Sequence, residues 1–471
     1  MKNIYLHDSS LSLYQSLNDT EGINIKYATA FNSMLEEETK IRTKYPKFNE
    51  TTFINRDTIR VDTPITIDYD IIETFRSTQL KVEHYLSRFN EMQYVIEYTY
   101  FDALNYLYNI FSKGEIDCVL TFSLEHGRPF ETIAIDLAKH FNIPAYTIDI
   151  CVGSGNYIGF VIYDHINSKH INLSDLPYTK PDIASYFFYE TLREKSDEAA
   201  PVPISSKFNS KKGLSKKVKE AIFYKSDFLY YLLMLYNRDR RHKIRVQKQT
   251  RNYYASIAIN KLPETKFIYY SLHVDPEATT MVRETLANQI MVIRMISESL
   301  PKGWVLCVKE HPAQFNVVNR VKVRLFQVLL HSQHKFRGKR FYDEIKQLNN
   351  VQLLSLKIPS KEILAKASAV GTINGTVSLE SLHNRVPVLH FGKMNPYLNL
   401  DGIFKITSPK ECKNVLRSIN NNEISEFSNI NSVQDFVFEA YLDYRNESDF
   451  YNPVSKVNKI LHNIFQEKFN F

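Results

Sequence analysis

Glycine is scarce in this chain, and cysteine and tryptophan are scarcer still. The 471 residues include 13 glycines, 4 cysteines and 1 tryptophan. Glycine therefore lies far below its usual share of about 7%, which excludes collagen-like and glycine-linker architectures. The cysteines have no CxxC spacing, so neither a zinc ribbon nor a disulfide framework is expected. We predict free thiols that act as small core hydrophobes in a reducing compartment.

Long apolar runs are also missing. The longest one, FLYYLLMLY at 228–236, is too short for the roughly 18 residues of a membrane span. The first ten residues, MKNIYLHDSS, lack the apolar centre of a signal peptide. GxxxxGK[ST], GxGxxG, HExxH and GxSxG motifs are absent. We therefore expect a cytoplasmic protein, whose alternative location is the inner face of the cytoplasmic membrane, and we expect no metal site and no required cofactor.

The residues that are present show an α/β rhythm. Hydrophobic residues make up 44% and charged residues 24%, a globular balance, and the length predicts two or three domains. Residues 116–150 read as strand, helix and strand with short joins, which indicates a parallel sheet. The rhythm restarts at 266–272 and continues with strands at 304–309, 351–354, 369–372 and 386–391. The predicted fold class is α/β with two Rossmann-like domains.

These patterns suggest four segments. We expect an N-terminal α/β domain over 1–200 and a basic helical linker over 201–262. A second, C-terminal α/β domain follows over 263–432, and a helical tail at 433–471 packs back towards the first domain.

Much of the net charge of +7 is concentrated in the linker, where lysines and arginines flank the apolar run. The aromatic rings lie in the apolar centre and not beside the cations, so base stacking and nucleic-acid binding are not expected. Two interpretations stay open for 207–254. It is either a long interdomain helix with a solvated basic face or a peripheral contact with an anionic membrane.

Three polar loops follow strands of the second half. The first, GTINGTVSLE at 371–380, combines a strand end, two turns and a helix start. Such a helix start favours an anion, and a carboxylate one turn later suits a ribose diol. An ordinary strand–turn–helix with threonine caps is the alternative. The candidate residues here are Thr372, Gly375, Thr376, Ser378 and Glu380.

The second loop begins with Lys309, Glu310, His311 and Pro312, directly after a buried-looking strand. At a strand end, His311 can donate a hydrogen bond to a phosphate or a proton to a leaving group, or simply bond the backbone. The third loop, at 271–280, carries His273 and Glu277, or is a plain polar loop with a proline-initiated helix. All three loops should meet at one edge of the sheet, because parallel strands end there together.

KEHP after a strand, GTINGTVSLESL about 60 residues later and then a VPVLHFG strand resemble the capsule and surface polysaccharide biosynthesis proteins. These are GT-B glycosyltransferases with a His-Pro motif, related to bacterial Kdo transferases and sialyltransferases. The resemblance covers mainly 266–392. It implies two Rossmann-like domains with the active site in the cleft between them, of which the C-terminal one, over 263–432, binds the nucleotide sugar. It also implies that His311 contacts the donor phosphate, that Thr372, Thr376 and Ser378 hold the phosphate or cytidine region, and that Glu380 holds the ribose.

The acceptor side requires a base in the first domain, because the attacking hydroxyl must lose its proton. Glu125, in the loop after the strand at 116–122, is our first candidate, and Asp149, near the end of the next strand, is the second. Glu125 could instead pair with Arg128, and Asp149 could cap a turn.

Taken together, the sequence predicts an inverting, metal-independent glycosyltransferase of bacterial surface polysaccharide synthesis. The resemblance favours a CMP-activated acidic sugar such as Kdo or sialic acid as donor, with UDP- and GDP-sugars as alternatives. The acceptor would be a glycan or a lipid-linked glycan. A non-catalytic polysaccharide assembly or export factor and a UDP-sugar 2-epimerase relative are the rival interpretations.

Overall fold

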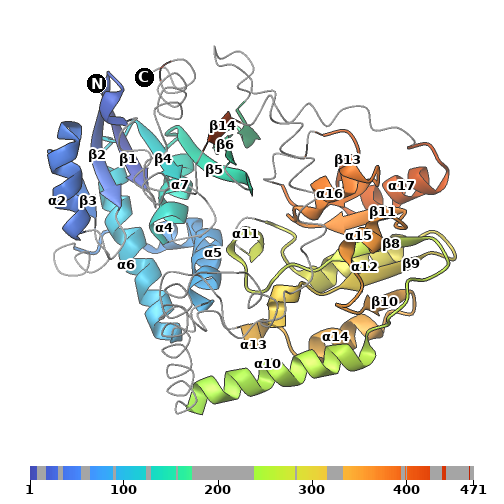
Figure 1. Ribbon diagram of the computed structural model, residues 1–471. Helices are drawn as coiled ribbons and strands as arrows, with labels where there is room; N and C mark the ends of the chain where they lie inside the picture. Colours follow the sequence, from blue (N-terminus) through green and yellow to red (C-terminus); the bar gives the residue numbers. More distant parts are fainter. Residues whose placement is uncertain are drawn as a thin grey trace, which may run out of the picture.

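The protein structure is a computed structural model of the 471-residue chain. It describes residues 1–7, 17–29, 35–54, 64–88, 92–122, 129–154, 157–171, 238–281, 284–315, 333–393, 398, 400–424, 438–441 and 466. The predicted fold class is confirmed, because the described chain forms two α/β units, each built on a mostly parallel sheet (Figure 1).

The first sheet has eight strands, in the order β14-β6-β5-β4-β1-β2-β3, with β7 paired to β6. Its strands are β1 (Lys2–His7), β2 (Ile23–Thr29), β3 (Thr52–Ile54), β4 (Cys118–Phe122), β5 (Ala145–Ser154), β6 (Tyr157–Asp164), β7 (Lys169–His170) and β14 (Phe438–Tyr441). Strands β1 to β5 run parallel, whereas β6, β7 and β14 extend the sheet by antiparallel pairing.

Helices cover the first sheet and bury its aromatic-rich core. They are α2 (Leu35–Lys44), η1 (Pro46–Phe48), α4 (Tyr69–Thr74), α5 (Arg76–Ser87), α6 (Gln93–Phe111) and α7 (Pro129–His140). Alternate strand residues such as Tyr5 and Val119 face the helices α6 and α7, where Leu104, Leu107 and Leu137 are fully buried. This period-2 pattern is what a half-covered strand requires.

The second sheet has six parallel strands, in the order β10-β9-β8-β11-β12-β13. Its strands are β8 (Phe267–Ser271), β9 (Val305–Lys309), β10 (Val351–Leu354), β11 (Ala369–Thr372), β12 (Val388–His390) and β13 (Ile403–Lys405). Its helices are α10 (Arg238–Ile257), α11 (Ala278–Met281), α12 (Gln289–Ser299), η4 (Pro312–Phe315), α13 (Gln333–Phe336), α14 (Lys339–Lys346), α15 (Ser360–Leu364), α16 (Val377–His383) and α17 (Pro409–Asn420).

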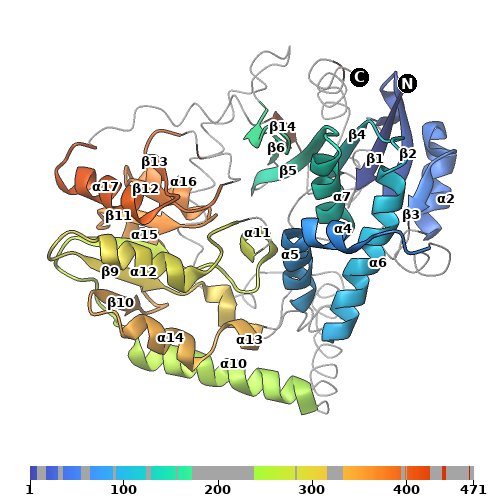
Figure 2. The same cartoon turned by 180° about the vertical axis from the view of Figure 1, so that it is seen from behind.

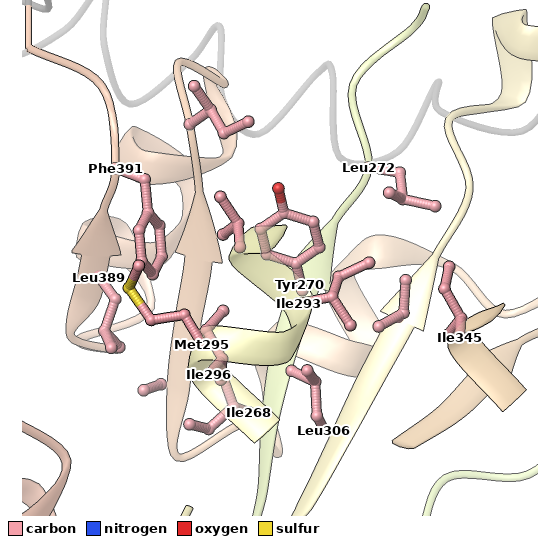
Figure 3. Close-up of a cluster of buried hydrophobic side chains, with 14 of the residues drawn as sticks. Ile268, Tyr270, Leu272, Ile293, Met295, Ile296, Leu306, Ile345, Leu389 and Phe391 are labelled. Carbon is pink, nitrogen blue, oxygen red and sulfur yellow. The ribbon is translucent and has the colours of Figure 1, made fainter. Parts of the chain in front are cut away.

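The core of the second unit explains one of the few glycines. Ile293 and Ile296 of α12 pack against Tyr270, Leu306 and neighbouring strand residues (Figure 3). A Cβ atom on Gly371 would lie 2.9 Å from Ile296 Cδ1, closer than side chains tolerate. Gly371, which opens the first of the three polar loops, thus makes room for the core.

The tail at 433–471 differs from the helix that its sequence suggested. Residues 438–441 form β14, which pairs antiparallel with β6 of the first sheet. A strand is favoured there because it completes the hydrogen bonds of the exposed edge of β6. Most of the tail lies outside the described residues.

Helix α10 lies along the outside of the second unit, as both views show (Figures 1 and 2). It packs against α13, α14 and η4 through Gln247, Thr250 and Tyr254, which are all buried. The first part of the predicted basic linker, up to residue 237, lies outside the described residues. No helix within the described ranges is long and apolar enough to cross a membrane.

Candidate functional site

The candidate site lies where the second sheet changes direction. The chain moves from β8 outwards to β9 and β10 on one side, and then resumes at β11 on the other side. Loops that leave β8 and β11 therefore turn away from each other and open a crevice at the carboxyl ends of these strands, where α/β proteins bind ligands. The three predicted loops follow β8, β9 and β11, so they meet at this edge of the sheet.

His273 follows β8 and holds the loop that follows β11. Its Nε2 atom lies 3.1 Å from the Thr372 hydroxyl oxygen and 3.2 Å from the backbone nitrogens of Ile373 and Asn374. Backbone N–H groups can only donate, so Nε2 carries the lone pair and the proton is assigned to Nδ1. Burial first, and the nearby His311 and His390 second, lower the pKa of His273 to about 3. A neutral His273 thus shapes the turn from below.

The turn after β11 uses most of its polar groups internally. The Gly375 N–H donates to the Thr372 hydroxyl over 3.0 Å, and the Ser378 hydroxyl donates to the Gly375 carbonyl over 3.0 Å. Both hydroxyl-bearing side chains are buried. Thr376, in contrast, is exposed at the N-cap of α16 and makes no side-chain capping bond. It is the hydroxyl of this turn that stands most open to a ligand.

Lys309, His311 and Glu380 form the other side of the candidate site. Lys309 is buried and donates to the Ile358 carbonyl over 2.6 Å. Burial lowers its pKa to about 8, an effect that Glu380 opposes. His311 is exposed, yet desolvation by the surrounding protein, followed by the charge of Lys309, lowers its pKa. Lys309 is thus within electrostatic reach of both Glu380 and His311.

Glu277 lies one turn into the loop after β8. Its carboxylate is 3.9 Å from His273 Nδ1 and is partly exposed. This position suits the Nδ1–H tautomer of His273. Of the predicted donor-side residues, Thr372, Gly375 and Ser378 are brought together with His273, and Lys309 lies near Glu380 and His311.

A buried polar network beneath these loops was missed by the sequence patterns. Arg337 is only 2% exposed, and its guanidinium donates to Glu310 over 3.0 Å, to the His273 carbonyl over 3.0 Å and to Asp275. The Tyr342 hydroxyl donates to the same Glu310 oxygen over 2.6 Å. An arginine between two short helices, α13 and α14, carries no motif, so no sequence signal pointed to it.

Two glutamines close the network around Asp275. The Gln289 amide donates to the Asp275 carboxylate over 2.7 Å and accepts from the His273 N–H over 2.7 Å. Gln314 accepts from the Asp275 N–H over 2.7 Å and donates to its carbonyl over 2.8 Å. The loops that carry His273 and His311 are thus tied to one another beneath the site.

The first unit approaches this edge of the second sheet. Helix α11, in the loop after β8, lies beside α5 in both views, and Met281 packs against the core of the first unit (Figures 1 and 2). The pKa of Lys139 in α7 is lowered mainly by burial, which the nearby Asp136 opposes. The positive charge of Lys393, which follows β12, lowers it further by a smaller amount, so Lys393 lies near α7 of the first unit. The candidate donor site therefore faces the first unit.

Of the two predicted acceptor-side bases, the structure describes only the backbone position of Asp149. Glu125 lies outside the described residues. Asp149 lies in β5, opposite Val161 of β6, and its side chain is not among those described. In the first sheet, the strand order changes direction between β1 and β4. The described side chains at that point are a buried histidine and a buried glutamate. His7 Nε2 lies 3.8 Å from the Glu131 carboxylate, and no sequence motif marked either residue.

Among the described residues, no group of three or more His, Cys, Asp or Glu side chains is arranged to hold a metal ion. No protein-family model matches the sequence, and no curated protein matches it significantly.

Several solved structures are similar over most of the chain. A KpsC β-Kdo 2,4-transferase of Thermosulfurimonas dismutans is 11% identical, covers 74% of this chain and 88% of its own, and has a TM-score of 0.34. The β-Kdo 2,7-transferase of the same organism is 10% identical, covers 93% and 97%, and has a TM-score of 0.32. A UDP-GlcNAc 2-epimerase of Neisseria meningitidis bound to UDP-GlcNAc is 11% identical, covers 93% and 96%, and has a TM-score of 0.23. All three TM-scores lie below 0.5.

Proposed function

We propose that the protein is a GT-B-like glycosyltransferase that uses a nucleotide-sugar donor in bacterial surface polysaccharide synthesis. The observation that supports this most is the convergence of three polar loops at the switch point of the second sheet, on the edge that faces the first unit. A nucleotide at this edge would lie between the turn after β11 and His311. The sugar would then project towards the first unit, where the acceptor binds.

The side chains at this edge suit a pyrophosphate- or phosphate-linked nucleotide. His311 is accessible, and its lowered pKa leaves it neutral at pH 7, so it offers one N–H donor; the negative charge of a donor phosphate beside it would favour the imidazolium form. Thr376 adds an exposed hydroxyl, and Gly375 keeps the turn narrow. Lys309, Thr372, Ser378, His273 and Glu277 support these groups, and Glu380 is placed to bond the ribose.

The transfer itself would be inverting and independent of metal. The acceptor hydroxyl attacks the anomeric carbon while a carboxylate of the first unit, with Glu125 ranked before Asp149, takes its proton. The nucleotide leaves, and His311 stabilises or protonates its phosphate. The sequence resemblance favours CMP as the leaving nucleotide and an acidic sugar as the donor, ahead of UDP- and GDP-sugars.

His311→Ala tests the assignment, and His242→Ala, an exposed histidine on α10, is its control. We expect the first variant to lose sugar transfer to an added glycan or lipid-linked glycan while its melting temperature stays near that of the wild type. The control should keep full activity. Near-normal transfer by His311→Ala would refute the assignment. A thermal-shift screen with CMP, UDP, GDP and their sugar conjugates identifies the nucleotide.

Two rival functions predict different results in the same assays. A polysaccharide assembly or export factor would bind glycan or nucleotide without turnover of any nucleotide sugar. A UDP-sugar 2-epimerase would convert its donor in the absence of an acceptor, which product analysis detects.

We also propose that the basic segment over 207–254 contacts an anionic membrane. Within its described part, Arg241, Arg245 and Lys248 are exposed along one stripe of α10, opposite the buried face. None of the three forms an ion pair with a described residue. Binding to phosphatidylglycerol vesicles, but not to phosphatidylcholine vesicles, that is lost in Arg241→Glu/Arg245→Glu/Lys248→Glu would support this contact. Equal binding of the triple variant would refute it.

A further inference from the structure

Arg337 joins the two histidine-bearing loops of the candidate site. Its Nε–H donates to Glu310 Oε2 over 3.0 Å, and one terminal nitrogen donates to the carbonyl of His273 over 3.0 Å. Its other terminal nitrogen donates to Asp275. The second oxygen of Glu310, Oε1, accepts the backbone N–H of His311 over 2.9 Å. The Arg337 guanidinium therefore bonds the His273 loop directly, and it bonds the His311 loop through the Glu310 carboxylate.

The charges of this cluster depend on one another. The Glu310 side chain is fully buried and that of Asp275 is 13% exposed, so two carboxylates face one cation away from bulk water. Burial raises the pKa of Glu310, and Arg337 opposes that rise. Burial disfavours the charge of Arg337, but Glu310 and Asp275 outweigh it and raise the pKa of Arg337. Arg337 serves its three acceptors from three different nitrogens of one planar group, whereas a lysine would present all of its donors from a single nitrogen.

We propose that Arg337 is a positioning residue, which sets the place of His311 through Glu310 and that of His273 through its carbonyl. This inference rests on the proposed donor site but names a residue that no motif marked. Arg337 itself is too buried to contact a ligand. It fixes the separation between the loops after β8 and β9, and the nucleotide would have to fit that separation.

Tyr342 supplies a matched control. Its hydroxyl donates to the same Glu310 oxygen as Arg337 does, and it is equally buried. Its described hydrogen bond reaches the His311 loop alone. A role limited to stabilising Glu310 would make Tyr342→Phe and the Arg337 variants behave alike, whereas a role in joining the loops makes them differ.

The test compares Arg337→Lys, Tyr342→Phe and Arg337→Met/Glu310→Gln. The double variant removes one positive and one negative charge together, so it leaves no new unpaired carboxylate at Glu310, and glutamine still offers an oxygen to the His311 N–H. Asp275 loses its ion pair with Arg337 but keeps the hydrogen bond from Gln289. We therefore expect the double variant to melt below the wild type yet to stay folded at the assay temperature. It should bind CMP, UDP or GDP at least 30-fold more weakly, measured by calorimetry with the nucleotide that the wild type prefers. Arg337→Lys should lose about 10-fold and Tyr342→Phe less than threefold. Wild-type affinity in the double variant, or equal losses in the double variant and Tyr342→Phe, would overturn the proposal.

A second readout does not require any nucleotide to bind. The ring of His311 is titrated by NMR, with His311→Gln used to assign its signals. If the loop moves, His311 becomes more solvated and its pKa rises towards about 6.5 in the double variant. An unchanged titration would overturn the role of Arg337. Failure of the wild type to bind any nucleotide, with the shift of His311 still observed, would refute the proposed function and leave this inference standing.

Discussion

Tyr254 of α10 gives a sharp test of how this outer helix is joined to the candidate site. Its hydroxyl donates to the Leu354 carbonyl of β10 and accepts the Glu310 N–H over 3.0 Å, and the residue is 1% exposed. Tyr254→Phe keeps the ring contacts with Phe315 and Tyr342 but removes both hydrogen bonds. A buried N–H that loses its partner costs about 1–3 kcal/mol, and a lost bond to a carbonyl about 1 kcal/mol. We therefore expect the free energy of unfolding to fall by about 2–4 kcal/mol.

The single tryptophan of the chain provides the assay. Trp304 is buried in the core of the second unit, so its fluorescence during urea unfolding reports that unit alone. The control is Tyr253→Phe, the adjacent tyrosine, whose half-buried hydroxyl donates to Asp343. Water can replace that bond, so the control should lose less than about 1 kcal/mol. Equal losses in the two variants would show that the buried hydroxyl of Tyr254 does not hold the loop after β9 as described.

Two further predictions concern the turn after β11 and the buried histidines. A Cβ atom at Gly375 would lie 2.7 Å from the Thr372 hydroxyl, so Gly375→Ala should weaken nucleotide binding at least 10-fold. The control is Gly338→Ala, where a Cβ atom would meet nothing within 4 Å, and it should leave binding unchanged. Equal affinities of the two variants in calorimetry would contradict this prediction. His390 is fully buried and its pKa is lowered to about 4, burial being the main cause, whereas the unfolded value is about 6.5. The folded state thus binds fewer protons, and the stability that His390 contributes is present above pH 6.5 and lost as the pH falls towards 4, by about 2 kcal/mol at pH 5. Between pH 7 and pH 5, the free energy of unfolding measured in urea should fall by about 2 kcal/mol less for His390→Asn than for the wild type. Identical falls in the variant and the wild type would refute this prediction.

Short buried strands were the part of the fold that the sequence predicted best. The strands at 351–354 and 369–372 have the expected bounds, because each is an apolar run closed on both sides by turn residues. Ser360 is the first residue of α15, and Pro359 occupies the N-cap position. The strand at 438–441 was not foreseen, because its stability comes from the edge of β6 and not from its own residues.

The candidate site was predictable only in its outer parts. Polar loops after parallel strands must share an edge, so His273, His311 and Thr372 could be placed together from sequence. Arg337 could not, because its partners Glu310 and Asp275 lie 27 and 62 residues away and Arg337 itself belongs to no motif. The internal use of the Ser378 hydroxyl was equally hidden, since only the turn geometry decides whether it faces the backbone or the ligand.

Strand β14 has a consequence for the edge of the first sheet. The chain leaves the first sheet after β7, builds the second sheet, and returns to add β14 to the edge of the first. The two units are therefore joined at two crossings of the chain instead of one. A truncation before residue 438 would remove β14 and leave residues 157–160 of β6 without their antiparallel partner, so the last described strand of the chain completes the sheet that the first strand begins.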